Sequence, residues 1–311
     1  MSVTVVYSPK FLEHDMGAGH PEQPQRVAVC AAYLEAASFH EQLLWLSPRM
    51  ATLEELSWVH SPSYIELIQA LAQRGGGRLD ADTYVGPASY EIALLSAGGW
   101  LVGVDQVVDH YTSTFVLARP PGHHAERQRG MGFCLFSNAA LAAEYALREK
   151  GLSRVAIFDW DVHHGNGTQS IVEQDPRIAY CSIHEIGNYP GTGDRSEEGP
   201  YQNVLNIPLP ARSSRLEYLT AFDQEVRPFL ERFQPQLLIV SAGFDANRAD
   251  PLANMALEPE DFGTLTERCL QITPQLLLGL EGGYDLEALG NSVVQVVGAL
   301  VVNSQQKQNQ E

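Results

Sequence analysis

The sequence is poor in basic residues, with 20 lysines and arginines against 38 aspartates and glutamates in 311 residues. The formal net charge is −18 at pH 7. Proteins that bind the phosphate backbone cluster lysine and arginine on one face, so this deficit argues against nucleic acid as a direct partner. An acidic surface concentrates cationic ligands such as lysine-rich peptides or polyamines, although acidity also serves simply to keep a protein soluble.

Cysteines and long apolar runs are also scarce. The four cysteines form no CxxC pair, which excludes a zinc finger or a thioredoxin-like site, and we expect buried, reduced thiols. No apolar run approaches the ~20 residues that span a bilayer, so no membrane partner is expected. The first residues lack a basic segment followed by an apolar stretch, and we therefore predict a cytoplasmic protein. No pattern indicates the oligomeric state.

Short apolar segments alternate with amphipathic stretches along the whole chain. Strands are predicted at residues 3–7, 114–117, 155–158, 178–183, 237–240 and 276–280. Helices are predicted at residues 24–37, 62–74, 90–108, 138–150, 216–233, 259–272 and 286–302. Strands that are apolar throughout are buried on both faces, so we predict an α/β fold of three layers, α/β/α, with a central, mainly parallel sheet.

No repeat, low-complexity block or linker divides the chain, which predicts a single domain over residues 1–302. Residues 303–311 are rich in glutamine and asparagine and have little that is apolar to bury. We predict a disordered polar tail there.

Four predicted strands run directly into polar, glycine-rich turns at residues 119–124, 159–165, 241–245 and 281–284. Ligands of open parallel sheets bind outside the carboxyl ends of the strands, so these turns meet at one edge. Asp159, Asp161 and His163 alternate on one side of an extended segment, and Asp245 arrives from another strand. Such groups repel or stay undersolvated without a cation.

One imidazole and two carboxylates suit a catalytic zinc site with an open position for water. Fe²⁺, Co²⁺ or Mn²⁺ would also accept these ligands. The alternative is that aspartate and histidine at strand ends cap helices or bind each other. For any single residue this structural alternative is favoured, and we expect His164 to be a packed, hydrogen-bonded histidine. The four turns together favour a cation.

These motifs resemble the histone deacetylase superfamily nearly end to end. The resemblance includes His20-Pro21-Glu22 with Arg26, Gly132-Phe133-Cys134, Asp250-Pro251-Leu252 and the segments 119–125, 159–167, 189–194, 241–245 and 280–284. The phrases SAGFDA and LEGGY resemble the class II branch and its bacterial histone deacetylase-like amidohydrolases. The resemblance implies an arginase/deacetylase-like fold that hydrolyses N-acetylated amines.

The resemblance also implies a role for each matching residue. Asp161, His163 and Asp245 would hold Zn²⁺, and His123 and His124 would be the paired histidines beside the reacting water. Tyr284 would donate a hydrogen bond to the substrate carbonyl. Asp159 is placed to orient His123. The substrate tunnel would be lined by Gly132, Phe133 and Tyr189, with Leu252 near its mouth. A structural K⁺ would be bound by main-chain oxygens of Asp159, Asp161, His163 and Ile183 and by the Ser182 hydroxyl.

The sequence departs from the family pattern at specific positions. Asn166 stands where class I members have an aspartate, which predicts a less basic His124. Asp80 and Asp82 are both candidates for the rim aspartate that binds the substrate backbone. Tyr284 is not the histidine of the weakly active class IIa enzymes, and this favours catalysis.

We therefore predict a zinc-dependent deacetylase acting on acetyl-lysine in proteins or peptides. One alternative is an amidohydrolase of acetylated polyamines or other small amines. Another is a non-catalytic acetyl-lysine binder. Leu252 stands where polyamine-preferring class II relatives carry a glutamate, which favours acetyl-lysine. A binuclear arginase-like hydrolase would need more metal-facing carboxylates.

Overall fold

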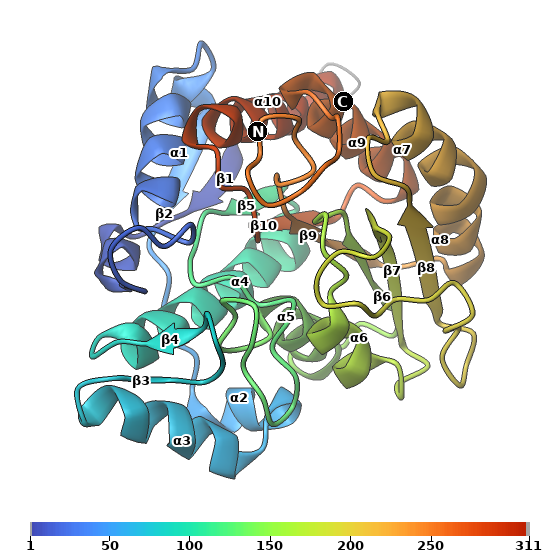
Figure 1. Ribbon diagram of the computed structural model, residues 1–311. Coiled ribbons are helices and arrows are strands. Elements are labelled where there is room, and N and C mark those ends of the chain that lie inside the picture. The colour runs from blue at the N-terminus through green and yellow to red at the C-terminus, as the bar shows by residue number, and fades with distance from the viewer. Residues whose placement is uncertain (1, 309–311) are drawn as a thin grey trace.

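An eight-stranded parallel sheet forms the centre of the computed structural model, which describes residues 2–308 (Figure 1). The strand order is β2-β1-β5-β10-β9-β6-β7-β8, and every neighbouring pair is parallel. The strands are β1 (Val3–Val6), β2 (Leu43–Leu46), β5 (Thr114–Val116), β6 (Val155–Asp159), β7 (Ile178–Glu185), β8 (Val204–Leu209), β9 (Leu237–Ala242) and β10 (Leu276–Leu280). A separate antiparallel pair joins β3 (Gly77–Arg78) to β4 (Tyr84–Val85).

Helices cover both faces of the sheet, which gives the predicted three layers. Helix α4 packs on β1, β5 and β10, and α5 packs on β6 and β9. On the other side α10 contacts β1 and is flanked by α1 and α9 (Figure 1). The α-helices are α1 (Gln25–Ala36), α2 (Leu53–Val59), α3 (Pro62–Gln73), α4 (Ser89–His110), α5 (Asn138–Arg148), α6 (Asn166–Val172), α7 (Arg215–Ala221), α8 (Arg227–Phe233), α9 (Pro259–Ile272) and α10 (Leu286–Gln308).

All six predicted strands and all seven predicted helical segments are present, with small shifts at their ends. The strands β6, β9 and β10 are buried at every residue, as their continuous apolar sequences require. The missed strands β2 and β8 lie at the two edges of the sheet and are only partly buried, so their sequences lack that apolar signature. Helices α2 and α6 were also missed. Helix α2 begins with a Thr52–Glu55 capping box, a signal that was available in the sequence, whereas α6 has no side-chain cap.

The predicted disordered tail is wrong for residues 303–308, because α10 continues to Gln308. Extending an established helix is easier than starting one, and serine and glutamine are tolerated in it. The amide of Gln305 also donates to Gln42 Oε1 at 2.6 Å, which holds this polar turn against the start of β2. Residues 309–311 of the predicted tail lie outside the described residues.

The expectation that no apolar stretch is long enough to span a bilayer also needs correction. By length and composition alone, α4 and the Leu286–Gln306 part of α10 pass that test. In the fold, α4 buries Trp100, Leu101 and Val104, and α10 buries Val293 and Leu300. Their apolar character therefore serves to cover the sheet.

His60, at the end of α2, supports a prediction on pH. Its Nδ1 donates to Glu126 O at 3.0 Å, and its Nε2 accepts from Ser137 N at 2.9 Å, so the ring is neutral. Burial lowers the pKa of His60 to about 4, below its ordinary value of 6.5. The unfolded chain therefore binds more protons between these values. The contribution of His60 to stability is complete above pH 6.5 and is lost as the pH falls through 4.

We expect wild type to lose about 2 kcal/mol more unfolding free energy than His60→Gln between pH 7 and 5. Glutamine keeps one donor and one acceptor at this site but does not titrate. Urea unfolding of both proteins at the two pH values provides the measurement. Equal losses in the two proteins would contradict the neutral, buried state of His60.

Candidate metal centre and active site

The polar turns meet at one edge of the sheet because they follow four adjacent strands. In the order β5-β10-β9-β6, each strand ends at the same side and continues into one of the turns. The prediction that these segments converge is thereby confirmed. The convergence depends on the order of the strands, which brings together residues that are far apart in the sequence. Glu281, for example, contacts Gly122 and Ser241, which lie about 160 and 40 positions before it.

Asp161, His163 and Asp245 are buried together, with one ligand atom of each within 4.8 Å of the others. His163 Nδ1 lies 3.1 Å from Asp161 Oδ1 and 3.2 Å from Asp245 Oδ2. Asp245 Oδ2 has no well-aligned hydrogen bond within the described part of the chain, although it is fully buried. A buried carboxylate oxygen without a donor is costly unless a cation balances it. These three side chains therefore fit a divalent metal ion.

Two glycines permit this close approach of carboxylates. A Cβ atom at Gly282 would lie 2.0 Å from Asp245 Oδ2, and one at Gly243 would lie 2.1 Å from Asp161 Oδ2. Main-chain groups also orient the carboxylates, since Gly282 N donates to Asp161 Oδ2 at 2.8 Å and Val162 N donates to Asp245 Oδ1 at 2.9 Å. The cluster is therefore preorganised by the ends of β6, β9 and β10.

Asp159 is directed away from this cluster and toward His123. Its Oδ2 lies 3.1 Å from His123 Nδ1 and accepts from the Tyr180 hydroxyl at 3.2 Å, while His123 Nε2 faces Asp161 Oδ1 at 3.8 Å. Burial opposes protonation of His123, but the negative charges of Asp161 and Asp159 outweigh it and raise the pKa of His123 to about 10. His123 is thus held as a cation when the carboxylates are ionised.

His124 is in a different electrostatic state although it is adjacent. Its Nδ1 lies 2.8 Å from Asn166 Oδ1, and the amide nitrogen of Asn166 donates to Glu126 Oε1 at 2.9 Å. The amide is thereby oriented with its oxygen toward the ring, so that Nδ1 carries the proton and Nε2 is an acceptor. Burial and the positive charges of His123 and His163 hold the pKa of His124 well below its ordinary value. The paired histidines therefore differ in protonation.

Mutation can distinguish the role of His124 from that of His164. His164 is packed between Thr192 Oγ1 and Gln169 Oε1, both at 2.8 Å, which confirms its prediction as a hydrogen-bonded histidine. We expect His124→Ala to lower kcat by about 10² to 10⁴, the range for a lost general base. His164→Ala should instead lower the melting temperature and leave most of the kcat of the folded enzyme.

Steady-state kinetics and thermal unfolding of both variants supply this comparison. Both variants should lose some thermal stability, because both rings are buried and hydrogen-bonded, so the comparison depends on the kcat of the folded enzymes. The reverse order of kinetic damage would show that the roles of His124 and His164 have been exchanged.

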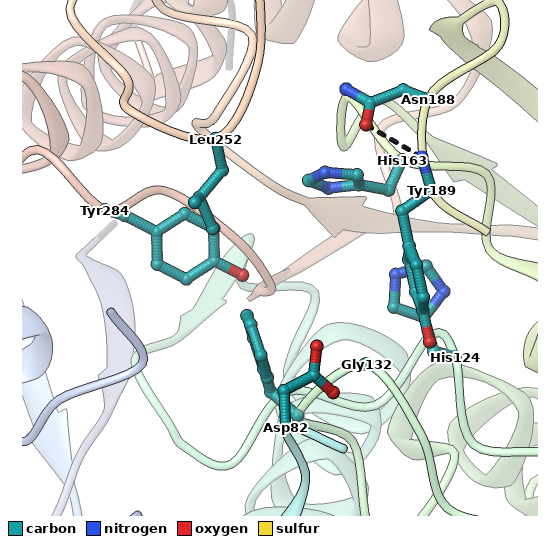
Figure 2. A pocket seen from close by; sticks show the side chains of 9 residues that line it. Asp82, His124, Gly132, His163, Asn188, Tyr189, Leu252 and Tyr284 are labelled. Atoms are coloured by element: carbon teal, nitrogen blue, oxygen red, sulfur yellow. Dashed lines mark hydrogen bonds between the residues drawn. The ribbon is translucent and has the colours of Figure 1, made fainter. Parts of the chain in front are cut away.

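Tyr284 enters the site from the end of β10, opposite the histidines. Its ring is held between the Arg26 guanidinium, 4.9 Å from the ring centre, and the edge of Phe133, 5.8 Å away. Its main-chain N–H donates to Asp250 Oδ2 at 2.7 Å. The preceding Gly283 has φ 115°, a backbone conformation that L-residues rarely adopt. Figure 2 shows the Tyr284 hydroxyl directed toward the interior of the pocket.

A cavity of about 200 Å³ opens above these groups. Figure 2 shows its lining residues, which are Asp82, His124, Gly132, Phe133, His163, Asn188, Tyr189, Leu252 and Tyr284. All four residues predicted to bind substrate are therefore brought to it. Of the two rim candidates, Asp82 lines the cavity, whereas Asp80 Oδ1 accepts the main-chain N–H groups of Asp82 and Thr83.

Backbone conformation keeps this cavity open beside the histidines. Gly132 has φ 54° and Phe133 has φ 69°, and a Cβ atom at Gly132 would lie 2.4 Å from His124 Cδ2. A side chain at residue 132 would thus fill the approach to His124. The rings of Tyr189 and His124 meet edge to face at 5.0 Å on the other wall.

The predicted potassium ligands lie at the junction of β6 and β7. Asp159 is paired with Ser182 in the register of these strands, and Ile183 follows it. The Ser182 hydroxyl lies 2.9 Å from His184 Nδ1. Binding of K⁺ by Asp159, Asp161, His163, Ser182 and Ile183 stays a prediction.

A buried ion network supports the Tyr284 loop, and the sequence analysis did not give it a role. Arg26 donates to Gly283 O at 2.7 Å and to Glu281 O at 2.5 Å, and it pairs with Glu22 at 3.1 Å. Arg119 binds the same Glu22 carboxylate at 2.6 and 2.8 Å. The sequence offered no local signal of their burial, since Glu22 and Arg26 stand in the polar segment of residues 20–26.

Comparison with known proteins defines the class. Residues 20–300 match the model of the histone deacetylase domain. The backbone is similar to the crystal structure of the HDA15 HD domain, with a TM-score of 0.92 and 34% sequence identity, covering 98% of this chain and 91% of that one. The fold is therefore the arginase/deacetylase fold.

Relatives extend this similarity over almost the full chain. A histone deacetylase-like amidohydrolase of Pseudomonas aeruginosa is 39% identical, over 88% of this chain and 75% of the relative. An uncharacterised protein of Synechocystis sp. is 49% identical, over 96% of this chain and 99% of the relative. The chain belongs to the histone deacetylase family and is a hydrolase.

Proposed function

We propose that this protein is a metal-dependent deacetylase that hydrolyses the acetyl amide of acetylated lysine in peptides or proteins. One observation carries the proposal. Asp161, His163 and Asp245 converge beside a histidine pair in which His123 is bonded to Asp159 and His124 to Asn166, and Tyr284 lines the adjoining cavity.

Asp161, His163 and Asp245 would hold the ion, for which Zn²⁺ is our first choice and Fe²⁺ or Co²⁺ the alternatives. Once bound, such an ion supplies a Lewis acid that polarises the amide carbonyl and makes water more acidic. The unsatisfied Asp245 Oδ2 supports this assignment. A structural K⁺ near Ser182 belongs to the same proposal.

The protein side chains would divide the proton transfers between them. Neutral His124 would accept a proton from the attacking water at Nε2, because Asn166 occupies Nδ1. His123, kept protonated by Asp159 and Asp161, would stabilise the developing negative charge and donate a proton to the departing amine. Burial raises the pKa of Tyr284, so its hydroxyl remains a donor for the carbonyl oxygen as that atom becomes negative.

The shape and charge of the cavity support a lysyl substrate. Phe133 and Tyr189 provide aromatic walls for an aliphatic chain, and the half-exposed Leu252 offers no charge to a distal ammonium group. Asp82 is the one acidic side chain of the lining, and it could accept an N–H group of a peptide. The same Asp82, together with the net charge of −18, is the observation that favours an acetylated polyamine as the second candidate.

The decisive experiment compares kcat/KM of the zinc-loaded protein for acetyl-lysine peptides and for N-acetylspermidine. We expect the peptides to be preferred. Leu252→Glu should raise the relative rate on acetylspermidine by about fivefold, which corresponds to a modest ion pair of about 1 kcal/mol. A wild-type preference for the polyamine would establish the second candidate. Binding of both ligands with cleavage of neither would indicate a non-catalytic binder.

A further inference from the structure

A fully buried carboxylate, Glu281, lies at the end of β10 and takes no part in the proton transfers proposed above. An ionisable side chain with no exposed surface is costly, so it persists where its hydrogen bonds serve a purpose. Arg26 contacts the main chain of Glu281 through its carbonyl oxygen, but the carboxylate forms no ion pair with lysine or arginine in the described part of the chain.

The hydrogen bonds of Glu281 join three strand ends. Its Oε2 accepts from Gly122 N at 2.6 Å and from His123 N at 3.2 Å, both in the turn that follows β5. Its Oε1 accepts from the Ser241 hydroxyl at 3.2 Å, near the end of β9. The side chain that directly follows β10 therefore connects the histidine turn to the strand that leads to Asp245.

A second metal site is the other reading of this region, because His123, Cys134 and Glu281 can place ligand atoms within 4.8 Å of one another. The hydrogen bonds argue against it. Both carboxylate oxygens of Glu281 already accept protein donors, and Cys134 Sγ donates to Gly132 O at 3.3 Å. The donor set is occupied, so the carboxylate acts as an anchor for the main chain.

The carbonyl oxygens of this turn have other donors, since Gly122 O accepts from Ala125 N and His123 O accepts from Thr168 N, both at 3.0 Å, so it is the N–H groups of the turn that depend on Glu281. A Cβ atom at Gly122 would lie 2.6 Å from Asn138 N and 2.8 Å from Phe136 O, so no side chain fits there. The N–H groups of Gly122 and His123 point instead to Glu281. The neighbouring Gly282 N–H binds the metal-ligand candidate Asp161 at 2.8 Å. The same short segment thus holds both the histidine turn and the carboxylate cluster.

We propose that Glu281 is a positioning residue, whose carboxylate oxygens fix the main chain of Gly122 and His123 relative to the Asp161 cluster. This inference rests on the proposed function, since it assigns the residue to the deacetylation reaction. The imidazole of His123 is then held at the correct distance from the reacting atoms. A displacement of about 1 Å in such a group can cost about 100-fold in rate.

Two conservative variants separate the reach of this side chain from its charge. Glu281→Gln keeps the length and an acceptor oxygen for Gly122 and His123, and the Ser241 hydroxyl can turn to accept from the new amide. Glu281→Asp keeps the charge but withdraws the oxygens by one methylene. We expect Glu281→Gln to stay within about threefold of the wild-type kcat and Glu281→Asp to lose at least about tenfold, with KM unchanged in both.

A spectroscopic measurement makes the test independent of turnover. Proton–nitrogen NMR of the histidine side chains, with and without zinc, reports the His123 Nδ1–H that is hydrogen-bonded to Asp159. This signal should be retained in Glu281→Gln and shifted in Glu281→Asp. Ser241→Ala, which removes only the donor to Oε1, is the matched control and should leave the signal in place.

The outcomes separate this inference from the proposed function. If wild type binds zinc but cleaves neither substrate, the proposed function fails, while the NMR comparison still tests Glu281. Equal kcat and equal His123 signals in wild type and Glu281→Asp would overturn the positioning role. Loss of activity in Glu281→Gln with retention in Glu281→Asp would overturn it as well, because charge rather than reach would then be responsible.

Discussion

Alanine at Asp161 or at His163 is expected to remove the bound metal and the activity together. Each side chain would supply one of three protein ligands, and the remaining two cannot satisfy a divalent ion that prefers at least four donors. Loss of the Lewis acid removes several kcal/mol of transition-state stabilisation, so kcat should fall by at least about 1,000-fold. Elemental analysis and a peptide deacetylation assay on the same samples measure both effects.

Thermal unfolding supplies an independent readout of the same prediction. Zinc that binds only the folded protein raises the melting temperature of wild type, and it should not do so for Asp161→Ala or His163→Ala. His124→Ala is the matched control, because it removes a neighbouring imidazole that is not among the three ligand candidates. It should keep both the metal and the zinc-induced shift. A fully loaded His163→Ala enzyme would show that the metal is held elsewhere.

Removal of a single oxygen in Tyr284→Phe should leave the metal in place and abolish most turnover. The main-chain bond to Asp250 and the contacts of the ring with Arg26 and Phe133 do not involve the hydroxyl, so the fold of the loop should survive. Only the donor to the developing oxyanion is lost. Such donors are worth about 10² to 10³ in kcat.

The chain offers a matched control for this substitution. Tyr189 lines the same cavity, but its ring packs edge-on against His124 and serves as a wall. Tyr189→Phe should therefore change kcat by no more than a few-fold, and any effect should be in KM. Metal content and melting temperature of both variants complete the comparison. A Tyr284→Phe enzyme with full kcat would remove the tyrosine from the mechanism.

The parts of the fold that could be predicted are those in which local sequence carries the physical signal. The strands β6, β9 and β10 are apolar at almost every position because both of their faces are buried, and helices such as α9 show clear amphipathic spacing. The edge strands β2 and β8 are only partly buried, so their sequences are less continuously apolar and the search for apolar runs did not find them. The final turn of α10 was missed because its polar composition carries no signal of burial.

The candidate site divides in the same way. Spacing placed Asp159, Asp161 and His163 on one segment, and the position of glycine-rich turns after strands indicated a common edge. Spacing could not show that Asp159 is directed to His123 while Asp161 faces His163, since the two carboxylates lie two residues apart at the end of the same strand. That choice came from the family resemblance, and it depends on contacts across strands.

Composition and periodicity were thus sufficient for the layered α/β architecture, the residue types of the site and their placement after strands. The order of the strands, the different hydrogen-bond partners of His123 and His124, and the anchoring contacts of Glu281, Arg26 and Asp250 emerged only with the folded chain. The physical reason is range. Hydrophobic patterning is a property of neighbouring residues, whereas burial, electrostatic fields and hydrogen bonds between strand ends depend on residues that are distant in sequence and adjacent in space.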